Sequence, residues 1–167
     1  MEFEISPLRP SDAEVIGPAH NRIWREAYAG LLPPAVLASR DDAAATRRWR
    51  ERGEQVQEHG RSAEGAVNLV ARFDGQPVGW ISVGPGRDDD PPTPTELWAL
   101  YVLPEHWGAG VAGRLVTAGL PPGPAHLWVL DGNERAIAFY RKVGFDIDGA
   151  TKELGTTGAI ERRMTRR

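Results

Sequence analysis

The sequence predicts an α+β fold, an α/β/α sandwich whose mixed, mostly antiparallel central sheet has about seven strands, with helices on both faces. Two strand-like runs joined by a tight turn, with a third strand close behind, indicate an antiparallel meander. The strand, glycine loop, helix and strand that follow indicate one parallel crossover. With 167 residues, 41% of them hydrophobic, the chain suits a single domain with one core, spanning residues 1–167.

A strand and a helix open the chain. The strand begins with alternating apolar residues and is closed by Pro7 and Pro10. Ser11 and Asp12 are residue types that cap helices, so we expect them to begin the helix that follows. The apolar stripe of this helix recurs at helical spacing and consists of Val15, Ile16, His20, Ile23, Trp24, Ala27 and Tyr28.

A second helical region follows the break at Gly30. It is predicted at residues 35–37 and again over about 42–52, where it carries Trp49. Residues 53–65 contain three glycines and are predicted as a polar loop.

The meander comes next. Strands over residues 67–73 and 77–83 are joined by Asp74-Gly75, a dipeptide typical of tight hairpin turns. The segment 84–95, GPGRDDDPPTPT, cannot continue a strand. It fits either a solvated loop or a flap that faces a substrate.

The C-terminal part of the chain predicts the crossover. Strand 96–102 is apolar at nearly every position, as a central strand is. A glycine loop, a helix over about 110–119 and a strand over 127–130 follow. Asn133 caps a last helix, which ends at Gly144. The runs left for a terminal pair of strands are 145–147, 152–154 and 159–164.

The glycine loop is the most informative segment. Glycines let backbone N–H groups approach a phosphate without Cβ clashes, and the next helix adds the positive end of its dipole. We therefore expect a ligand that carries phosphate groups. The backbone of this cradle belongs to Gly108, Ala109, Gly110, Val111, Ala112 and Gly113.

The same glycines match the G-x-G-x-x-G fingerprint of dinucleotide-binding folds, with Asp131 at the end of the next strand. Three features argue against that interpretation. Residues 103–107 separate the strand from the first glycine, whereas the fingerprint turns directly off its strand. The preceding strands form a meander, and too few residues follow Asp131 for the rest of a doubly wound sheet.

Two segments together resemble a known family. VLPEHWGAGVAGRL, residues 102–115, is similar to motif A of the GCN5-related N-acetyltransferase (GNAT) superfamily, V-x-P-x-x-(Q/R)-G-x-G-(I/V)-(G/A)-x-x-L, which binds the pyrophosphate of acetyl-CoA. NERAIAFYRKVGF, residues 133–145, is similar to motif B of that family. The resemblance spans nearly the whole chain and includes WREAY at 24–28, Trp49 and G-x-x-E-x-R-M at 158–164.

The resemblance implies an N-acetyltransferase that moves the acetyl group from acetyl-CoA (CoA) directly to a primary amine of a small molecule or a peptide. The absence of cysteine agrees with transfer without a cysteine acyl-enzyme. The resemblance further implies that main-chain groups near Leu100, Tyr101 and Val102 bind the pantetheine arm and polarise the carbonyl. The side chains that it implies for CoA binding are Asn133, Phe139, Tyr140 and Lys142.

One position departs from motif A. Trp107 stands where the family prefers Gln or Arg, and an indole cannot supply amide or guanidinium donors. We therefore expect the pyrophosphate contacts at Trp107 and the following glycines to come mainly from backbone N–H groups. A catalytically silent acyl-CoA-binding or regulatory module of the same fold is the alternative that this departure favours.

Acetyl transfer needs an acid for the leaving thiolate and a base for the amine. Tyr140 is the candidate acid, because a phenol is protonated at neutral pH and the residue lies two helical turns after Asn133. Glu96, the one acid of the central strand, is the candidate base, acting through water. Trp24 and Tyr28, one helical turn apart, are predicted to line the acceptor pocket, with ordinary core packing as the alternative.

Composition excludes several classes of partner. A net charge of −3 gives no general attraction to nucleic acid or to anionic lipid. We expect a cytoplasmic protein, because no signal peptide is recognisable and no apolar run approaches the ~18 residues of a membrane span. The four histidines lack metal-ligand spacing, so no metal site is expected. A homodimer is compatible with the resemblance, and the acceptor stays unnamed.

Overall fold

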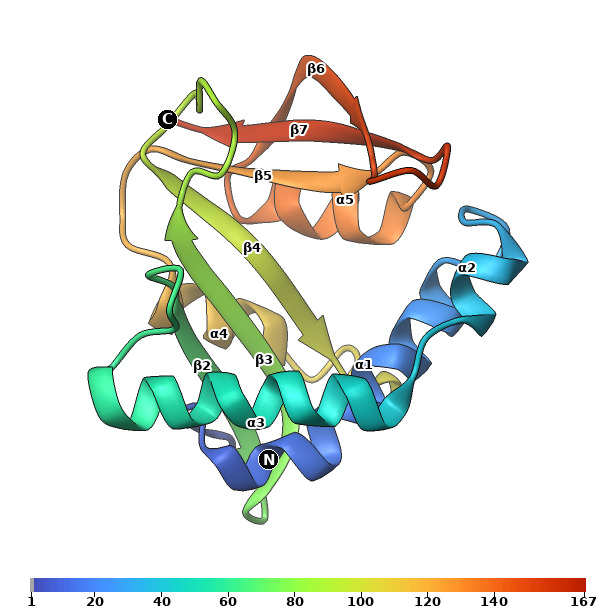
Figure 1. Ribbon diagram of the computed structural model, residues 1–167. Coiled ribbons are helices and arrows are strands. Elements are labelled where there is room, and N and C mark those ends of the chain that lie inside the picture. Colours follow the sequence, from blue (N-terminus) through green and yellow to red (C-terminus); the bar gives the residue numbers. More distant parts are fainter. Residues whose placement is uncertain (1) are drawn as a thin grey trace.

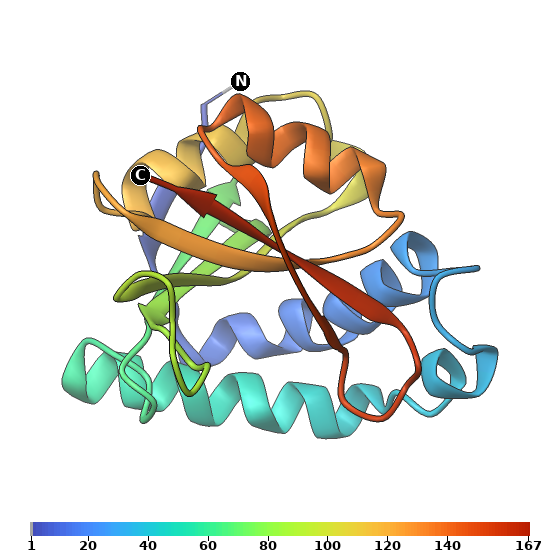
Figure 2. The ribbon, with the colours of Figure 1, turned by 90° about the horizontal axis from the view of Figure 1, so that it is seen from above.

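The computed structural model describes residues 2–167, which form a seven-stranded sheet between two layers of helices (Figure 2). The strand order is β1-β2-β3-β4-β5-β7-β6, and all neighbours are antiparallel except the parallel pair β4 and β5. This arrangement confirms the predicted α+β sandwich. The strands are β1 (Glu4–Pro7), β2 (Val67–Phe73), β3 (Gln76–Pro85), β4 (Thr95–Val102), β5 (Ala125–Leu130), β6 (Asp146–Glu153) and β7 (Ile160–Arg166).

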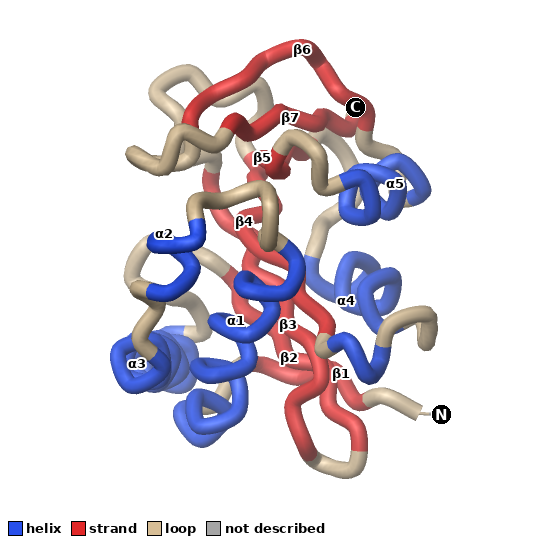
Figure 3. The backbone as a smooth tube through the Cα atoms, turned by 90° about the vertical axis from the view of Figure 1, so that its right-hand side faces the viewer, coloured by secondary structure: helices blue, strands red, loops and turns tan. Residues whose placement is uncertain are grey.

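Helices cover both faces of the sheet (Figures 1 and 3). On one face lie α1 (Ala13–Ala27) and α3 (Asp42–His59), with α2 (Pro34–Ala38) beside α1; on the other lie α4 (Val111–Gly119) and α5 (Glu134–Lys142). Each face has its own apolar core, with Trp80 buried toward α1 and α3 and with Phe145 and Met164 buried toward α4 and α5. Within residues 2–167, none of the helices combines the length and apolar character that a bilayer crossing requires.

The predicted hairpin turn at Asp74-Gly75 joins β2 to β3. Both residues have a positive φ, 49° at Asp74 and 77° at Gly75. This backbone conformation matches the right-handed twist of the flanking strands, which is why the dipeptide is a reliable turn signal.

The predicted loop over residues 53–65 is wrong in its first half, because α3 continues to His59. Gly53 is part of the helix and lies against the backbone of Arg9 and Pro10, where the 3₁₀ turn before α1 begins; a Cβ there would be only 2.6 Å from the Pro10 nitrogen. This glycine therefore serves a close helix contact and does not end the helix. The helix ends at Gly60, which has the left-handed conformation (φ 76°) typical of a helix C-terminus.

The predicted capping role of Ser11 and Asp12 is also wrong. They lie in a short 3₁₀ turn, and the Asp12 side chain caps no amide of α1. Its carboxylate instead pairs with the buried Arg72 guanidinium of β2, with an Nη2–Oδ2 distance of 2.8 Å, and accepts from the Arg9 amide at 2.7 Å. An aspartate can either cap a helix or form a buried ion pair, so its position before the helix in the sequence could not show which role Asp12 has.

The terminal strands differ in extent from their prediction. The runs at 145–147 and 152–154 belong to one strand, β6, which pairs with β7 on either side of an irregularity between Ile147 and Thr151. Gly149, with a φ of 96°, lies in this irregular stretch.

The seam between β4 and β5 positions the candidate site. The two strands pair only at Glu96–His126 and Leu97–Leu127, and beyond that they diverge (Figure 1). On its other edge β4 stays paired with β3, with a register shift opposite Ser82 and Val83. One edge of β4 is therefore free over its second half, in the middle of the sheet.

Candidate active site

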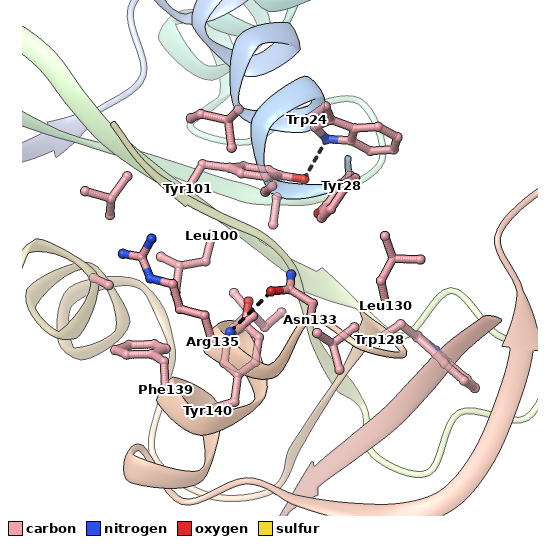
Figure 4. A pocket seen from close by; sticks show the side chains of 18 of the residues that line it. Trp24, Tyr28, Leu100, Tyr101, Trp128, Leu130, Asn133, Arg135, Phe139 and Tyr140 are labelled. Carbon is pink, nitrogen blue, oxygen red and sulfur yellow. Dashed lines mark hydrogen bonds between the residues drawn. The ribbon is translucent and has the colours of Figure 1, made fainter. Parts of the chain in front are cut away.

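A cavity of about 920 Å³ lies at the opening between β4 and β5. Its wall includes residues of α1 from one face of the sheet and residues of α5 and the start of α4 from the other. In Figure 4, Trp24, Tyr28 and Tyr101 lie on one side of Asn133, and Phe139 and Tyr140 lie on the opposite side. Residues from both faces of the sheet therefore meet around one cavity at the point where the strands part.

The glycine loop forms one end of the cavity. Gly108 and Gly110 have positive φ values of 78° and 81°, and a Cβ at either position would meet no atom within 4 Å. Gly110 precedes α4 and offers no side-chain cap, so the first-turn N–H groups of this helix have no side-chain acceptor. Of the predicted cradle, Ala109 alone does not line the cavity; Gly108, Gly110, Val111, Ala112 and Gly113 do.

Trp107 also lines the cavity and does not seal it. Its indole N–H donates to the Val102 carbonyl at 2.9 Å, and 44% of the residue is exposed. The Arg135 guanidinium of α5 lies 3.2 Å from the centre of the indole ring and lines the same cavity. A cation therefore stands beside the glycine loop, although it comes from position 135 and not from position 107.

Helix α5 brings three of the predicted residues to the cavity: Asn133, Phe139 and Tyr140. Asn133 caps the helix, its side-chain oxygen accepting from the Ala136 amide at 3.4 Å. Burial raises the pKa of the Tyr140 phenol, which keeps the hydroxyl protonated. The predicted residue Lys142, at the end of the helix, does not line the cavity.

Leu100, Tyr101 and Val102, the predicted main-chain ligands, lie on the free edge of β4. All three residues pair with β3 and line the cavity on the side where β5 has moved away. Backbone groups on that free edge can bind an extended ligand as a neighbouring strand would.

Trp24 and Tyr28 line the cavity from α1, as predicted for the acceptor side. Their rings are 4.9 Å apart between centroids, and the Trp24 indole N–H donates to the Tyr101 hydroxyl at 3.1 Å (Figure 4). Burial raises the pKa of Tyr28 and of Tyr101. The three side chains form an aromatic wall, and the Arg40 guanidinium stacks on its Trp24 ring at 3.9 Å from the ring centre.

Glu96 lies away from this cavity, at the closed end of the seam. Its side chain is only 1% exposed, and it does not belong to the cavity wall. One carboxylate oxygen accepts from the Arg87 guanidinium at 2.6 and 3.1 Å, and the other accepts from the Arg87 amide at 2.8 Å. With its oxygens engaged in this way, Glu96 holds Arg87 in the cavity wall and is not placed to deprotonate a substrate.

The loop over residues 86–94 is fixed to the sheet. Asp88 accepts from the Trp128 indole N–H at 2.8 Å and from the Lys152 ammonium at 2.9 Å. Neither sequence interpretation of this segment anticipated that it supplies Arg87 to the cavity.

Sequence reasoning missed two carboxylates that line the cavity, Glu153 of β6 and Glu161 of β7. Burial raises the pKa of Glu161. The signal was present in the terminal G-x-x-E-x-R-M run, but the strand's face toward the cavity depends on the paths of β5 and β6.

Comparisons with known proteins agree with this geometry. The family model described as "Acetyltransferase (GNAT) family" matches residues 24–145. A protein of Mycobacterium tuberculosis (strain ATCC 25618 / H37Rv) named "Probable N-acetyltransferase Rv2775" is 30% identical over 152 residues, which cover 89% of this chain and 83% of that protein. An uncharacterized N-acetyltransferase of the same strain, Rv2669, is 39% identical over 94 residues, or 52% of this chain and 58% of that protein.

Solved structures share the fold. The PaiA N-acetyltransferase of Thermoplasma acidophilum, crystallised with coenzyme A, is similar over 100% of this chain and 99% of its own, with a TM-score of 0.73 and 19% identity. A ribosomal-protein-alanine N-acetyltransferase of Brucella melitensis is similar over 98% of both chains, with a TM-score of 0.68 and 20% identity. Together with the family match, which takes in the glycine loop and the helix that carries Tyr140, these findings confirm the resemblance: this chain belongs to the GNAT family of acetyltransferases.

Proposed function

We propose that the protein transfers the acetyl group of acetyl-CoA directly to a primary amine of a small molecule, with Tyr140 as the general acid. The observation that carries the proposal is the cavity at the parted strands β4 and β5. A cradle for a diphosphate lies at one end and an aromatic wall lies on the other side, while Tyr140 lines the same cavity. Substrates that enter from opposite faces would meet beside a phenol.

The glycine loop fits the diphosphate of CoA. Gly108 and Gly110 leave open space where a Cβ would stand, and the first turn of α4 has no side-chain cap. We expect the diphosphate oxygens to accept from backbone N–H groups of residues 108–113, with the Arg135 guanidinium beside them. The pantetheine arm would lie along the free edge of β4 and reach Asn133. Bound acetyl-CoA supplies the acyl group as an activated thioester.

Tyr140 supplies the proton that the leaving sulfur needs. Since burial raises its pKa, the phenol stays protonated across the pH range in which an amine acts as a nucleophile. A backbone N–H on the free edge of β4, near Leu100–Val102, would stabilise the carbonyl oxygen as negative charge develops there.

Calorimetry and a turnover assay test the proposal in two steps. Titration with CoA is expected to give saturable binding, and a Gly110→Val variant, strained at a φ of 81°, is expected to bind more weakly. Thiol release from acetyl-CoA with a panel of primary amines is then expected to exceed the rate without amine. Binding without turnover on any amine would support the alternative, an acyl-CoA-binding module, which the replacement at Trp107 favours; no binding at all would overturn both functions.

A further inference from the structure

We propose that Glu161 binds the ammonium group of the acceptor and takes its proton, so that the acceptor is a primary amine on an aromatic or apolar body that carries no carboxylate. This inference rests on the proposed acetyl transfer and adds to it the acceptor class and the base.

The strand register places Glu161 in the acceptor half of the cavity. Its neighbours in the sheet are Leu130 of β5 and Lys152 of β6. Met164, three residues along the same strand, is fully buried in the core toward α4 and α5. Side chains alternate along a strand, so Glu161 points to the opposite face, where α1 lies.

The carboxylate of Glu161 lacks a protein counter-ion, although basic side chains surround it. Each of these basic groups is already paired with another acid, and within residues 2–167 Glu161 itself forms no ion pair. A half-buried carboxylate whose basic neighbours are paired with other acids favours a cationic ligand. The pairs are Arg87–Glu96, Lys152–Asp88, Arg162–Asp131 and Arg163–Asp148.

Glu161 lines the same cavity as the aromatic wall of Trp24, Tyr28 and Tyr101. Its strand register turns it toward the face covered by α1, the helix that carries Trp24 and has Tyr28 at its C-terminal end. The carboxylate and the aromatic wall therefore share the acceptor half of the cavity.

Besides the charged residues Arg87, Lys152 and Glu153, the lining of this half of the cavity is largely apolar or aromatic and includes Trp24, Trp98, Trp128 and Leu130. Large rings favour an apolar or aromatic body on the acceptor. A carboxylate on the acceptor would face Glu161, and the two basic side chains that line this half of the cavity, Arg87 and Lys152, are already paired with Glu96 and Asp88. The other acid that lines the cavity, Glu153, accepts from the Gly158 amide at 2.8 Å and is exposed to solvent, so it attracts a second ammonium more weakly than Glu161 attracts the first.

The chemical step balances with these groups. The ammonium gives one proton to Glu161, and the freed lone pair forms the C–N bond to the thioester carbonyl carbon. As the C–S bond breaks, the sulfur takes the Tyr140 proton. One of the two protons still on the nitrogen then passes to the phenolate, and the other stays in the amide. Glu161 then releases its proton to solvent, so that the net products are the amide, CoA thiol and one proton.

The test compares Glu161→Gln with the wild-type protein, using phenethylamine, phenylalanine and spermidine as probes. We expect wild-type turnover of phenethylamine to exceed that of the other two by at least about tenfold, and Glu161→Gln to lower kcat/KM for phenethylamine by about 100-fold at pH 7. This loss is expected to shrink as the pH approaches the pKa of the amine itself, because the nucleophile then deprotonates in solution.

Three controls separate this inference from misfolding and from failure of the proposed function. Glu161→Asp keeps the carboxylate and is expected to retain much of the activity, while Asp146→Asn, at the exposed start of β6 and outside the cavity wall, is expected to change kcat/KM less than about threefold. CoA binding by Glu161→Gln is expected to match the wild type. A loss that does not depend on pH, an unaffected Glu161→Gln variant, or a preference for phenylalanine or spermidine would overturn the inference while wild-type turnover upholds acetyl transfer. No turnover by wild type on any amine would overturn both.

Discussion

Each end of the β4–β5 seam contains a carboxylate, which is paired and buried at the closed end and has no ion-pair partner among the described residues at the open end. At the closed end, Glu96 and His126 face each other across paired strands, and both are essentially inaccessible. Arg87 satisfies Glu96, and the Thr93 hydroxyl lies 2.7 Å from His126 Nδ1. At the open end, Glu161 has no ion-pair partner among residues 2–167.

The difference shows how one strand pair provides both structure and chemistry. Where the strands pair, charged groups are neutralised by one another and hold the loop 86–94 in place. Where the strands part, the free backbone edge of β4 and the polar groups around it are left for ligands. An acid in a central strand is therefore a poor guide to catalysis unless the strand's partner is known.

The largest effect is expected at the open end. Tyr140→Phe removes the proton donor and is expected to lower kcat by ~10²-fold while CoA affinity stays the same. Steady-state kinetics with calorimetry on the same preparation would measure both quantities. Unchanged turnover would remove Tyr140 from the mechanism and leave the open end without an acid.

Glu96→Gln is expected to show the opposite behaviour. It removes the buried partner of Arg87, and we expect the free energy of unfolding to fall by about 2 kcal/mol, since the half-exposed arginine can turn to water. Urea denaturation would measure this loss. Glu161→Gln is the matched control, expected to stay within about 0.5 kcal/mol of the wild type because no ion pair is broken. Equal losses for both variants would remove the contrast between the two ends.

The pH dependence of stability tests the closed end. Burial lowers the pKa of His126, against the opposing charges of Glu96 and Asp88. Because the unfolded chain then binds the proton more readily, stability is full above about pH 6.5 and falls as the pH drops below it, by at most about 1.4 kcal/mol per pH unit for one group.

His126→Gln is therefore expected to flatten this fall, measured by urea denaturation between pH 7.5 and 5. The exposed His59→Gln is the control and is expected to leave the slope unchanged. Burial also lowers the pKa of His20, to about 3, and this contribution is present in both variants and cancels in the difference. If the free energy of unfolding depended on pH in the same way for His126→Gln and the wild type, the fall in stability could not be attributed to His126.

The smallest effect is expected at the entrance beside the glycine loop. Arg135→Gln removes the cation stacked on Trp107 and is expected to weaken CoA binding about fivefold at low salt and less at high salt. Arg141→Gln, on the same helix and outside the cavity wall, is the control. If both variants bound CoA with the same affinity, Arg135 would make no contribution, and backbone N–H groups alone would bind the diphosphate.

The sequence predicted the parts of the molecule that depend on local pattern. The hairpin at Asp74-Gly75, the cap at Asn133 and the glycines before α4 each follow from the backbone conformation that a few neighbouring residues prefer. The roles of Asp12 and Gly53 were predicted wrongly, because each is set by a contact with a distant segment. Glu161 was missed for the same reason, since a strand's pattern gives two faces but not what covers each of them.

Helix α5 carries the stacked guanidinium of Arg135 near its first turn and the phenol of Tyr140 near its last. In the proposed binding mode, contacts between Arg135 and the donor's diphosphate would also fix the position of Tyr140 beside the sulfur, because one short helix carries both residues. Binding energy from a part of the donor that never reacts would thereby be converted into rate. A truncated donor such as acetyl-pantetheine, which lacks the nucleotide, would consequently have a low kcat even when it saturates the enzyme.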